Sequence, residues 1–416
     1  MTHVPLRRNR DFTLLQAGSL LSSFGGQLTQ IAFPLLVLAV TGSPAKVGLV
    51  AFVGALPYPL FTLLAGVAAD RWNRKWLMIG ADMVGLVAIG TLAVAIVGDN
   101  LSYWHIVIVA FVKGTAATVL FAAQVGVVRA VVPAPQLPDA VSIEVARVAV
   151  VRLAGPPIGG ALFVVGRAIP FVLDTISYAC STVALLLMRT PFQEAREVDT
   201  STLRAQIAEG FRFLWSHPFL RTCALLFGFG NFIFPGVLVV IVVVGKDQGL
   251  SGGEIGALTA VFGAFLLIGS AISRLFRRLF GVRTILLLEL WTWTGSVLFV
   301  IWPNVYVLAA STIPQALTIP STDSVVHSYR MAMTPDRLIG RVNGAASNIS
   351  LAVAPLGPLV AGVLLGAVSA RAAVSVFAAA GLVLALWGTL SPSIRSAPSL
   401  DELREVPQPE PATVPI

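Results

Sequence analysis

Long apolar runs alternate with short polar connections along almost the whole chain. Each run approaches the roughly 20 residues that a helix needs to cross a bilayer. Twelve such runs predict membrane-spanning helices at 14–38, 47–69, 76–97, 103–127, 140–165, 168–188, 219–244, 254–273, 281–302, 305–328, 341–367 and 372–390. The expected fold class is therefore an all-α integral membrane protein with twelve transmembrane helices.

Composition supports this prediction. Of the 416 residues, 56% are hydrophobic and only 12% are charged, and the mean hydropathy is +0.86. Soluble domains carry about 25% charged residues. The chain is too apolar for a soluble enzyme or a soluble binding module.

Three segments of the first half recur in the second half at nearly one offset, between 201 and 203 residues. The pairs are GVAADRWNRKW (66–76) with GSAISRLFRRL (269–279), GPPIGG (155–160) with GPLVAG (357–362), and QIAFP (30–34) with NFIFP (231–235). The repeat predicts two pseudo-symmetric halves of six helices. Parallel halves with a substrate site between them are typical of one class of secondary transporter.

The repeat also sets the expected domains. We predict an N-terminal six-helix bundle at 1–188 and a C-terminal one at 219–390. The charged stretch 189–218 contains STLRAQIAEGFRFLW, whose apolar residues follow helical spacing, so we expect a linker helix lying on the inner membrane surface. The proline-rich tail, 391–416, predicts a disordered cytoplasmic segment.

Positive charge indicates the topology. The net charge is +8, and most Lys and Arg residues fall at the N-terminus, in alternate connections and in the C-terminal tail. Only four fall in the other connections: Lys46, Arg167, Lys246 and Arg371. By the positive-inside rule, we expect both termini of a multi-pass protein of the inner (plasma) membrane to be cytoplasmic. This placement accounts for the basic charge, so membrane lipid is an expected partner and nucleic acid is not.

The sequence gives no sign of cofactor chemistry. Cys180 and Cys223 have no His or Cys at metal-ligand spacing, and neither a GxxxxGK[ST] phosphate loop nor a nucleophile elbow is present. We expect a monomer that binds no metal or cofactor and is not an enzyme.

The connection after the second span, GVAADRWNRK, concentrates ionised side chains. Gly66 would let its helix lie close to a neighbour. Asp70 would accept hydrogen bonds from the N–H groups that begin the span 341–367, beside Arg341, with the helix dipole adding roughly 0.3–2 kcal/mol. Such a contact would act as a latch that holds the cytoplasmic face closed. In the alternative, the cations are ordinary membrane anchors: Arg71, Arg74 and Lys75.

The segment GPPIGG places small residues inside the span 140–165. Gly155, Gly159 and Gly160 would allow close helix packing, and Pro156 with its neighbour would bend the helix locally. We therefore expect this segment to take part in gating.

These motifs resemble known ones. GVAADRWNRK resembles the signature of the major facilitator superfamily, and GPPIGG resembles the core of a motif associated there with exporters that work by exchange. RNRDFTLLQAGSLLSSFGGQLTQIAFPLLV, TGSPAKVGL and TPDRLIGRVNG are similar to the macrolide-efflux and siderophore-exporter branch. The resemblance implies the major facilitator fold, with a cavity lined by the spans 14–38, 103–127, 219–244 and 305–328.

Polar residues inside the spans are candidates for substrate binding. Lys113 lies near the bilayer centre, where a cation costs several kcal/mol unless it meets water or a partner. It would project toward the substrate, pair with an acid, or snorkel to the surface. Gln27 and Gln30 share a face of the first span, and Asn231 is the repeat mate of Gln30. These amides would bind a ligand or join helices.

Acidic residues within the spans are candidate proton carriers: Asp82, Glu144, Asp174, Glu289 and Asp323. Asp323 and His327 are one turn apart and share a helix face, so they would relay a proton near neutral pH. Alternatively, they form a salt-bridge cluster with Arg330.

The sequence thus favours a secondary active transporter. We expect proton-coupled efflux of a small amphipathic compound, drug-, macrolide- or siderophore-like, by alternating access. An uptake transporter and a non-transporting membrane sensor or scaffold on the same fold remain the alternatives.

Overall fold

The computed structural model describes residues 6–124, 126–190, 192, 203–335 and 338–397, and nearly all of them are helical. The first group comprises α1 (Arg10–Thr41), α2 (Pro44–Ala55), α3 (Pro57–Arg71), α4 (Arg74–Val97), α5 (Tyr103–Gln124), α6 (Val127–Val131), α7 (Leu137–Val165) and α8 (Ile169–Leu187). The second comprises α9 (Leu203–Ser216), α10 (Pro218–Gly230), α11 (Ile233–Asp247), α12 (Gly252–Leu279), α13 (Val282–Thr292), α14 (Val297–Ile301), α15 (Val305–Ser311), α16 (Ile313–Met333), α17 (Ile339–Val353), α18 (Leu356–Ala367), α19 (Ala370–Leu390) and α20 (Pro392–Arg395).

Eleven helical segments in the described residues are long and apolar enough to cross a membrane. Several of them join two helices, as α2 and α3 do over Pro44–Arg71. The predicted span 305–328 is also helical, but it is divided into α15 and α16 at Thr312 and carries several hydroxyl side chains besides Asp323 and His327. The all-α membrane architecture is confirmed. The polarity of α16 explains why eleven segments, and not twelve, are both long and apolar enough to cross a membrane.

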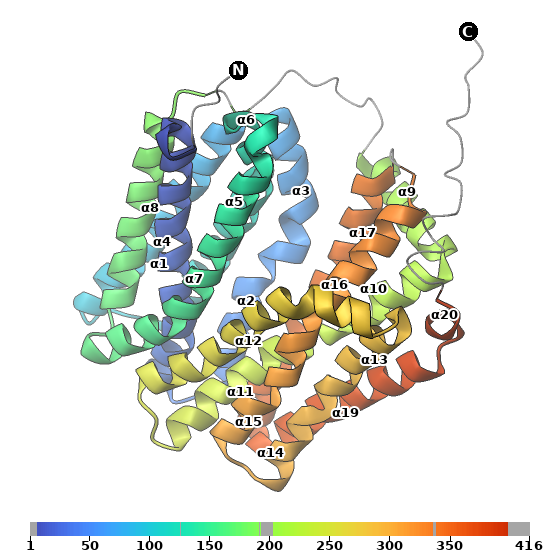
Figure 1. The fold of residues 1–416 in the computed structure, drawn as a ribbon. Coiled ribbons are helices and arrows are strands. Elements are labelled where there is room, and N and C mark those ends of the chain that lie inside the picture. The colour runs from blue at the N-terminus through green and yellow to red at the C-terminus, as the bar shows by residue number, and fades with distance from the viewer. Residues whose placement is uncertain (1–5, 125, 191, 193–202, 336–337, 398–416) are drawn as a thin grey trace.

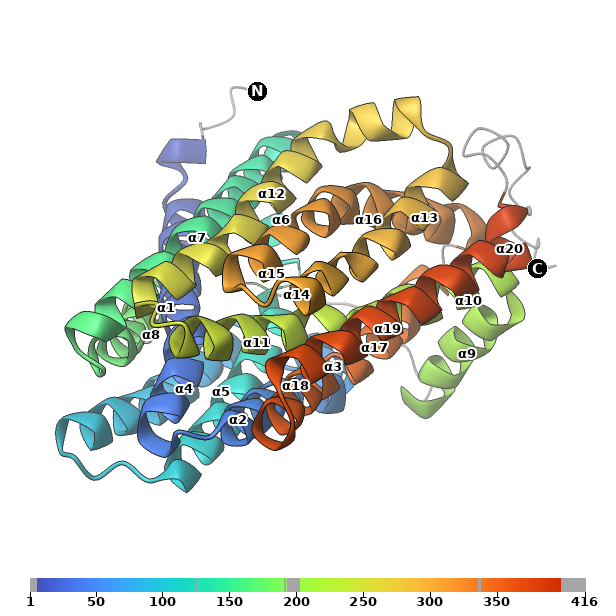
Figure 2. The ribbon, with the colours of Figure 1, turned by 90° about the horizontal axis from the view of Figure 1, so that it is seen from below.

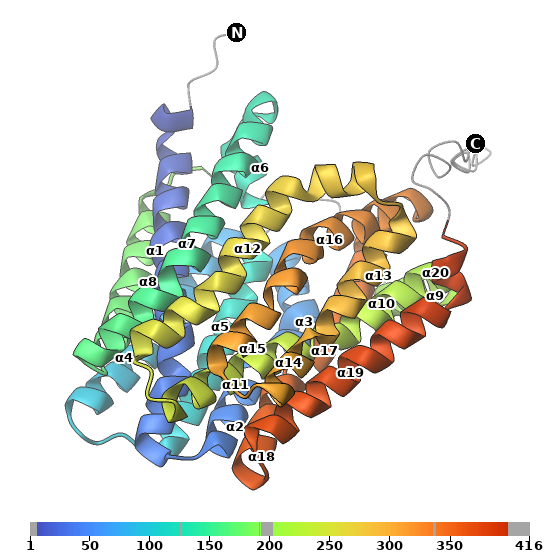
Figure 3. The ribbon, with the colours of Figure 1, turned by 60° about the horizontal axis from the view of Figure 1, so that its bottom comes forward.

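The helices form two groups that lie side by side (Figure 1). Helices α1 to α8 make one group, and α10 to α19 make the other. We call the end where α1 begins and α3, α5 and α8 finish the α6 end, and the opposite end the α2 end. Seen from the α2 end, α7 runs beside α12 and α2 beside α18 (Figures 2 and 3).

Local sequence explains how the chain turns at the α2 end. After α1, Gly42 adopts a left-handed φ of 61°, and its N–H donates to the carbonyl of Leu38. Ser43 then caps α2 by accepting from the backbone N–H of Lys46, and Pro44 occupies the first helical turn. Gly, Ser and Pro are the residues that suit a helix end, an N-cap and a helix start. The segment TGSP therefore reverses the chain within three residues.

Glycine contacts join the two groups at the α2 end. Gly160 of α7 lies against the backbone of Gly252 in α12, and Gly256 lies against the carbonyl of Pro156. On the other side, a methyl group at Gly362 of α18 would lie 2.7 Å from Cα of Gly48 in α2. Because no side chains separate these helices, their backbones touch.

The linker helix α9 packs against the second group of helices. Part of its apolar face is covered by protein: Leu214 is fully buried, and Gly210 lies against the backbone of Arg341 in α17. The side chain of Arg341 also pairs with Glu209. Helices α17 and α10 therefore cover part of the apolar face, and the position of α9 on the membrane surface stays a prediction.

The C-terminal tail is described only to residue 397. Its first residues form α20, where Ile394 is fully buried, so order extends beyond the predicted boundary at 391. The rest of the predicted disordered tail, 398–416, and residues 193–202 of the linker lie outside the described residues.

Candidate functional site

Three helices of the first group converge on one buried ion pair. Nζ of Lys113 on α5 lies 2.7 Å from Oδ2 of Asp174 on α8. The Asp174 side chain is fully buried and that of Lys113 is 16% exposed. Of the alternatives for Lys113, pairing with an acid is the one that the structure shows.

A hydroxyl from α1 completes the cluster. Oγ1 of Thr29 donates to Oδ2 of Asp174 over 2.8 Å, and Lys113 donates to the same hydroxyl. Ser177, one turn along α8, donates to the Asp174 carbonyl at 2.7 Å and is 3.4 Å from Oδ1. Because a charged pair inside a membrane needs its remaining donors and acceptors satisfied, these bonds make the pair tenable.

The surrounding residues hold the pair in place. Gly25 brings α1 against α8, since a Cβ there would lie 2.6 Å from Oδ1 of Asp174. Nζ of Lys113 is 5.7 Å from the ring centroid of Phe33, which itself stands edge-on to Phe171 at 5.3 Å. Phe33 thereby adds a cation–π contact.

The predicted amides lie apart from this cluster. Gln30 is exposed, Gln27 is partly buried beside Gly155, and neither makes a hydrogen bond among the described residues. Asn231 ends α10, is exposed, and donates to the carbonyl of Phe227 in its own helix over 3.2 Å. Their role in substrate binding stays a prediction.

The connection between α3 and α4 is tied within its own group of helices. Arg74 pairs with Asp70 at 3.1 Å and donates to the carbonyl of Ala69. Lys75 donates to the Met188 carbonyl over 2.6 Å and so caps the end of α8. Asp70 is 63% exposed on its side chain, and Arg71 is exposed. These bonds do not test the latch to α17, which stays a prediction.

The expectation for Gly66 is wrong in this structure. Among the described residues, no neighbouring helix places an atom within 4 Å of a Cβ built there, whereas at its repeat mate Gly269 a Cβ would lie 2.6 Å from the Leu317 carbonyl. Helix α3 is open at this point, while α12 packs closely on α16.

The expectation for GPPIGG is met in its packing. Gly155 lies against Cβ of Gln27, and a Cβ at Gly159 would lie 2.5 Å from the carbonyl of Leu28, so both glycines face α1. Gly160 and Pro156 face α12, as described above. Both prolines lie inside the continuous helix α7.

The remaining acidic candidates lie in different environments. Asp323 and His327 are both exposed on α16, and no ion pair joins Asp323 to Arg330 in the described part of the chain. The guanidinium of Arg330 instead donates to Asn343 over 3.0 Å. A salt bridge to Arg330 is therefore not formed in the described part of the chain, and the proton relay by Asp323 and His327 stays a prediction.

Two carboxyl groups are buried without full pairing. Asp82 on α4 is fully buried and Glu289 on α13 is 5% exposed. Both oxygens of Asp82 and Oε2 of Glu289 lack a hydrogen-bond partner among the described residues. Burial of this kind marks a candidate for proton binding.

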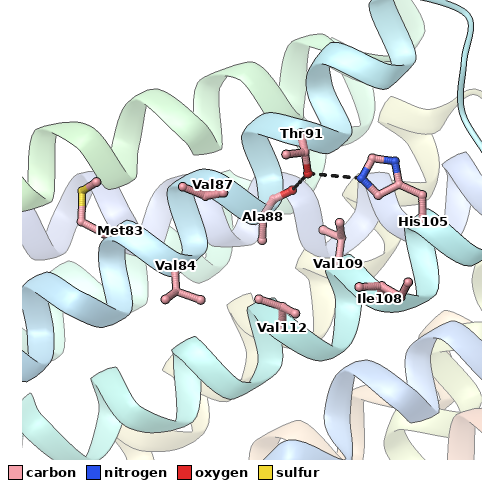
Figure 4. A pocket seen from close by; sticks show the side chains of 9 residues that line it. All are labelled: Met83, Val84, Val87, Ala88, Thr91, His105, Ile108, Val109 and Val112. Atoms are coloured by element: carbon pink, nitrogen blue, oxygen red, sulfur yellow. Dashed lines mark hydrogen bonds between the residues drawn. The ribbon is translucent and has the colours of Figure 1, made fainter.

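A surface groove of about 490 Å³ lies between α4 and α5 (Figure 4). Its lining is apolar except for Thr91 and His105, which hydrogen-bond across it at 3.2 Å. Val87 and Ile108 are 57% and 61% exposed, so the groove faces outward and suits lipid chains. It does not include Lys113 or Asp174.

Sequence analysis did not single out two residues of the site region. Thr29 has no signal of its own in an apolar segment. Arg147, inside α7, pairs with Glu144 at 3.8 Å and donates to Ser23 over 3.4 Å. Its position within the span 140–165 was a signal that would have found it.

Comparison with family models gives two matches. The model described as "Transmembrane secretion effector" matches residues 1–313, and "Major Facilitator Superfamily" matches residues 222–412. Together they cover nearly the whole chain.

Two relatives named as efflux proteins align with this chain at low sequence identity. "Multidrug efflux pump Tap" of Mycolicibacterium fortuitum is 26% identical over 401 residues, which is 92% of this chain and 95% of the pump. "Macrolide efflux protein A" of Streptococcus pyogenes is 22% identical over 239 residues, 57% of this chain and 59% of that protein.

Solved structures share the fold. A bacterial homologue of the human lysosomal transporter Spinster, in an inward-facing, unoccupied conformation, superposes with a TM-score of 0.71 at 15% identity and covers 94% of this chain and 98% of its own. A bacterial homologue of the iron transporter ferroportin has a TM-score of 0.71 at 16% identity, covering 93% of this chain and 99% of its own.

Proposed function

Because the chain belongs to the major facilitator superfamily, in the family of transmembrane secretion effectors, we propose that it is a secondary active transporter that exports small amphipathic compounds in exchange for protons. Relatives named as multidrug and macrolide efflux pumps support export. The substrate class that we propose is drug-like or macrolide-like.

The placement of charge supports the orientation. Arg8, Arg71 and Lys75 lie at or beside the α6 end, and Lys46 lies at the α2 end. The positive-inside rule then makes the α6 end cytoplasmic, with both termini inside the cell. The glycine contacts between the groups lie at the α2 end, so we assign this structure to a state closed to the outside.

The proposed coupling to protons rests on one observation, the Lys113–Asp174 ion pair. A carboxylate and an ammonium at 2.7 Å neutralise each other in the membrane interior. When a proton binds Asp174, the carboxyl becomes neutral and the ammonium loses its counter-ion. The charge of Lys113 then repels a cationic compound and must seek water.

The change between ionised and protonated Asp174 would couple the flux of protons to the flux of the exported compound. A cationic amphipathic compound is accepted while the pair is intact, and a proton on Asp174 makes the same region net positive. Proton and compound therefore exclude each other, which is the requirement for exchange. The 16% exposure of Lys113 leaves its head able to respond to a bound compound, whereas Asp174 is closed off.

The test is transport in everted membrane vesicles with an imposed proton gradient. The probes are ethidium, a small amphipathic cation, and radiolabelled erythromycin. Gradient-dependent accumulation inside the vesicles is expected, and an ionophore that collapses the gradient should abolish it. Accumulation that does not depend on the gradient would contradict the proposed proton coupling. Gradient-driven loss of the probe from the everted vesicles would show that the protein imports it into the cell.

The Asp174→Asn variant serves as the control for the pair in the same assay. It keeps the shape of the side chain and removes the titrating group. Because Lys113 then lacks its counter-ion, we expect this variant to bind ethidium weakly and to accumulate none. Normal accumulation by this variant would move the coupling site elsewhere.

A further inference from the structure

Polar side chains line the buried face of α8, beginning at the ion pair. This face carries Asp174, Ser177, Tyr178, Ser181 and Thr182, all of which are buried. Helix α8 lies between α1 and α4: Gly18 of α1 packs on Ser181 and Ala184, and Gly85 of α4 packs on the ring of Tyr178. We call these five residues of α8, together with Asp82 of α4, the polar seam.

Asp82 is the unexplained member of this seam. It is fully buried, and neither of its oxygens has a hydrogen-bond partner among the described residues. The Ser181 hydroxyl is close enough to interact with the carboxyl, although no well-formed hydrogen bond joins them, and Oγ1 of Thr182 is buried without a hydrogen-bond partner among the described residues. Buried polar groups in native proteins are almost always satisfied by protein or by ordered water. The buried carboxyl of Asp82 therefore has polar atoms that a water bound between α4 and α8 would satisfy.

The fold itself does not require this polarity. The repeat offset of 203 residues places Phe377 at the position of Asp174 and Gly381 at that of Tyr178. The buried face of α19 is otherwise made of Ala373, Val374, Ala378, Leu384, Ala385 and Gly388. One half thus packs the same helix with apolar residues, so the seam serves something other than packing.

Asp174 needs a route for its proton. Its side chain is fully buried, and Lys113 and Thr29 occupy its hydrogen-bonding side. From Asp174, α8 continues toward the α6 end, and Thr182 lies about 12 Å further along at 1.5 Å per residue. The seam therefore extends from the ion pair toward the end that we assign to the cytoplasm.

We propose that the seam is a hydrated proton path and that Asp82 is its relay, an inference that rests on the proposed proton exchange. The proton leaves the carboxylic acid of Asp174, passes through water to the carboxylate of Asp82, and is released to solvent at the α6 end. Only O–H bonds form and break. Asp174 returns to the carboxylate that pairs with Lys113, and Asp82 returns to its starting state.

The experiment compares proton movement with substrate movement in the same proteoliposomes. A pH-sensitive dye reports proton release when ethidium is added, and counterflow of labelled erythromycin without a proton gradient reports the conformational cycle alone. In Asp82→Asn, we expect proton release to slow by about tenfold or more, since a relay that cannot ionise is lost. Counterflow should stay within about twofold of the wild-type rate, because it needs no net proton transfer.

Matched variants separate a relay from a packing role. Asp82→Leu, which removes water-binding atoms as well, should slow proton release further, and Asp82→Glu should restore part of it. Ser311→Ala, a buried serine of the second half that bonds only its own helix, should change neither rate. A thermal melt of each variant reports folding.

Three results would overturn the proposal. Proton release at the wild-type rate in Asp82→Asn would show that the path lies elsewhere. Equal loss of proton release and counterflow would make Asp82 a structural residue. If the wild-type protein itself releases no protons on adding ethidium while counterflow proceeds, the proposed exchange fails, and the relay fails with it.

Discussion

The two halves of this transporter place very different chemistry at corresponding positions. In the first half, Lys113 and Asp174 form a buried ion pair. The repeat puts Ala316 and Phe377 at these positions in the second half, and both are fully buried. Phe377 there contacts Phe232 of α11, with ring centroids 5.2 Å apart. An aromatic pair thus stands where the other half has charges.

The difference shows that the same fold accepts either an ion pair or an aromatic contact at this position. The two contacts have different physical properties. An aromatic contact contributes stability without changing with pH or membrane voltage. A buried ion pair contributes less net stability, because desolvation offsets its attraction, but it responds to a proton. The first half therefore holds the pair that we propose responds to protons, and the second half has an apolar contact at the corresponding position.

Breaking the ion pair should give the largest effect. Lys113→Ala leaves Asp174 buried without a counter-ion, which costs about 3–5 kcal/mol. We expect a strong loss of thermal stability and no gradient-driven accumulation of ethidium. The double variant Lys113→Ala/Asp174→Asn should recover the stability and not the accumulation. Equal melting temperatures for the single and double variants would contradict the pairing.

Charge retention with altered shape sharpens this test. Lys113→Arg keeps the cation but replaces a compact ammonium by a planar fork, so partial transport is expected. Full activity would show that only the charge matters.

The next effect concerns the repeated glycines. Gly269→Leu should destabilise the protein by about 1–3 kcal/mol, because its neighbour on α16 leaves no room for a side chain. Gly66→Leu should leave the melting temperature nearly unchanged, since the space there is open. Similar shifts in the two variants would show that α3 and α12 pack alike in solution.

A smaller effect is expected at the connections that follow these glycines. Asp70→Asn keeps volume and removes the charge of the predicted latch, whose dipole interaction is worth roughly 0.3–2 kcal/mol. Transport should slow at equal membrane abundance. Ser273→Asp, which adds a charge at the repeat mate, should be tolerated better. Normal transport by Asp70→Asn would leave the cations of this connection as plain anchors.

The smallest effect on coupling is expected at Phe377. Phe377→Leu removes the aromatic contact with Phe232 and should lower the melting temperature. The number of protons released per ethidium moved should stay unchanged, because no titrating group is involved. A changed ratio would place part of the coupling in the second half.

The sequence alone predicts the helices, because span length and charge placement are local properties. The repeat and the family resemblance can also be read directly from its motifs. The sequence does not predict that Lys113 meets Asp174, which lies 61 positions away. That contact depends on how α5 and α8 are rotated about their axes. In α5 the residues just before Lys113 are apolar on all sides, so they do not reveal which way the lysine faces.

Two other outcomes depend on packing between distant segments. The apolar face of α9 is the same for lipid and for α17, so amphipathicity cannot choose between them. Gly66 and Gly269 are repeat mates in similar apolar segments, and the arrangement of the helices separates the open position from the packed one. The latch at Asp70 and the roles of Gln27, Gln30 and Asn231 stay predictions.

The backbone contacts between Gly160 and Gly252 and between Gly48 and Gly362 have an evolutionary consequence. Any amino-acid substitution at these four positions adds at least a methyl group between two main chains, so selection should remove almost every one of them. Neighbouring positions that face lipid should accept most apolar residues. In a saturation-mutagenesis library selected for drug resistance, these four positions should therefore stay glycine, while lipid-facing positions of the same helices accept other apolar residues. The invariant positions would mark where the two halves come into backbone contact.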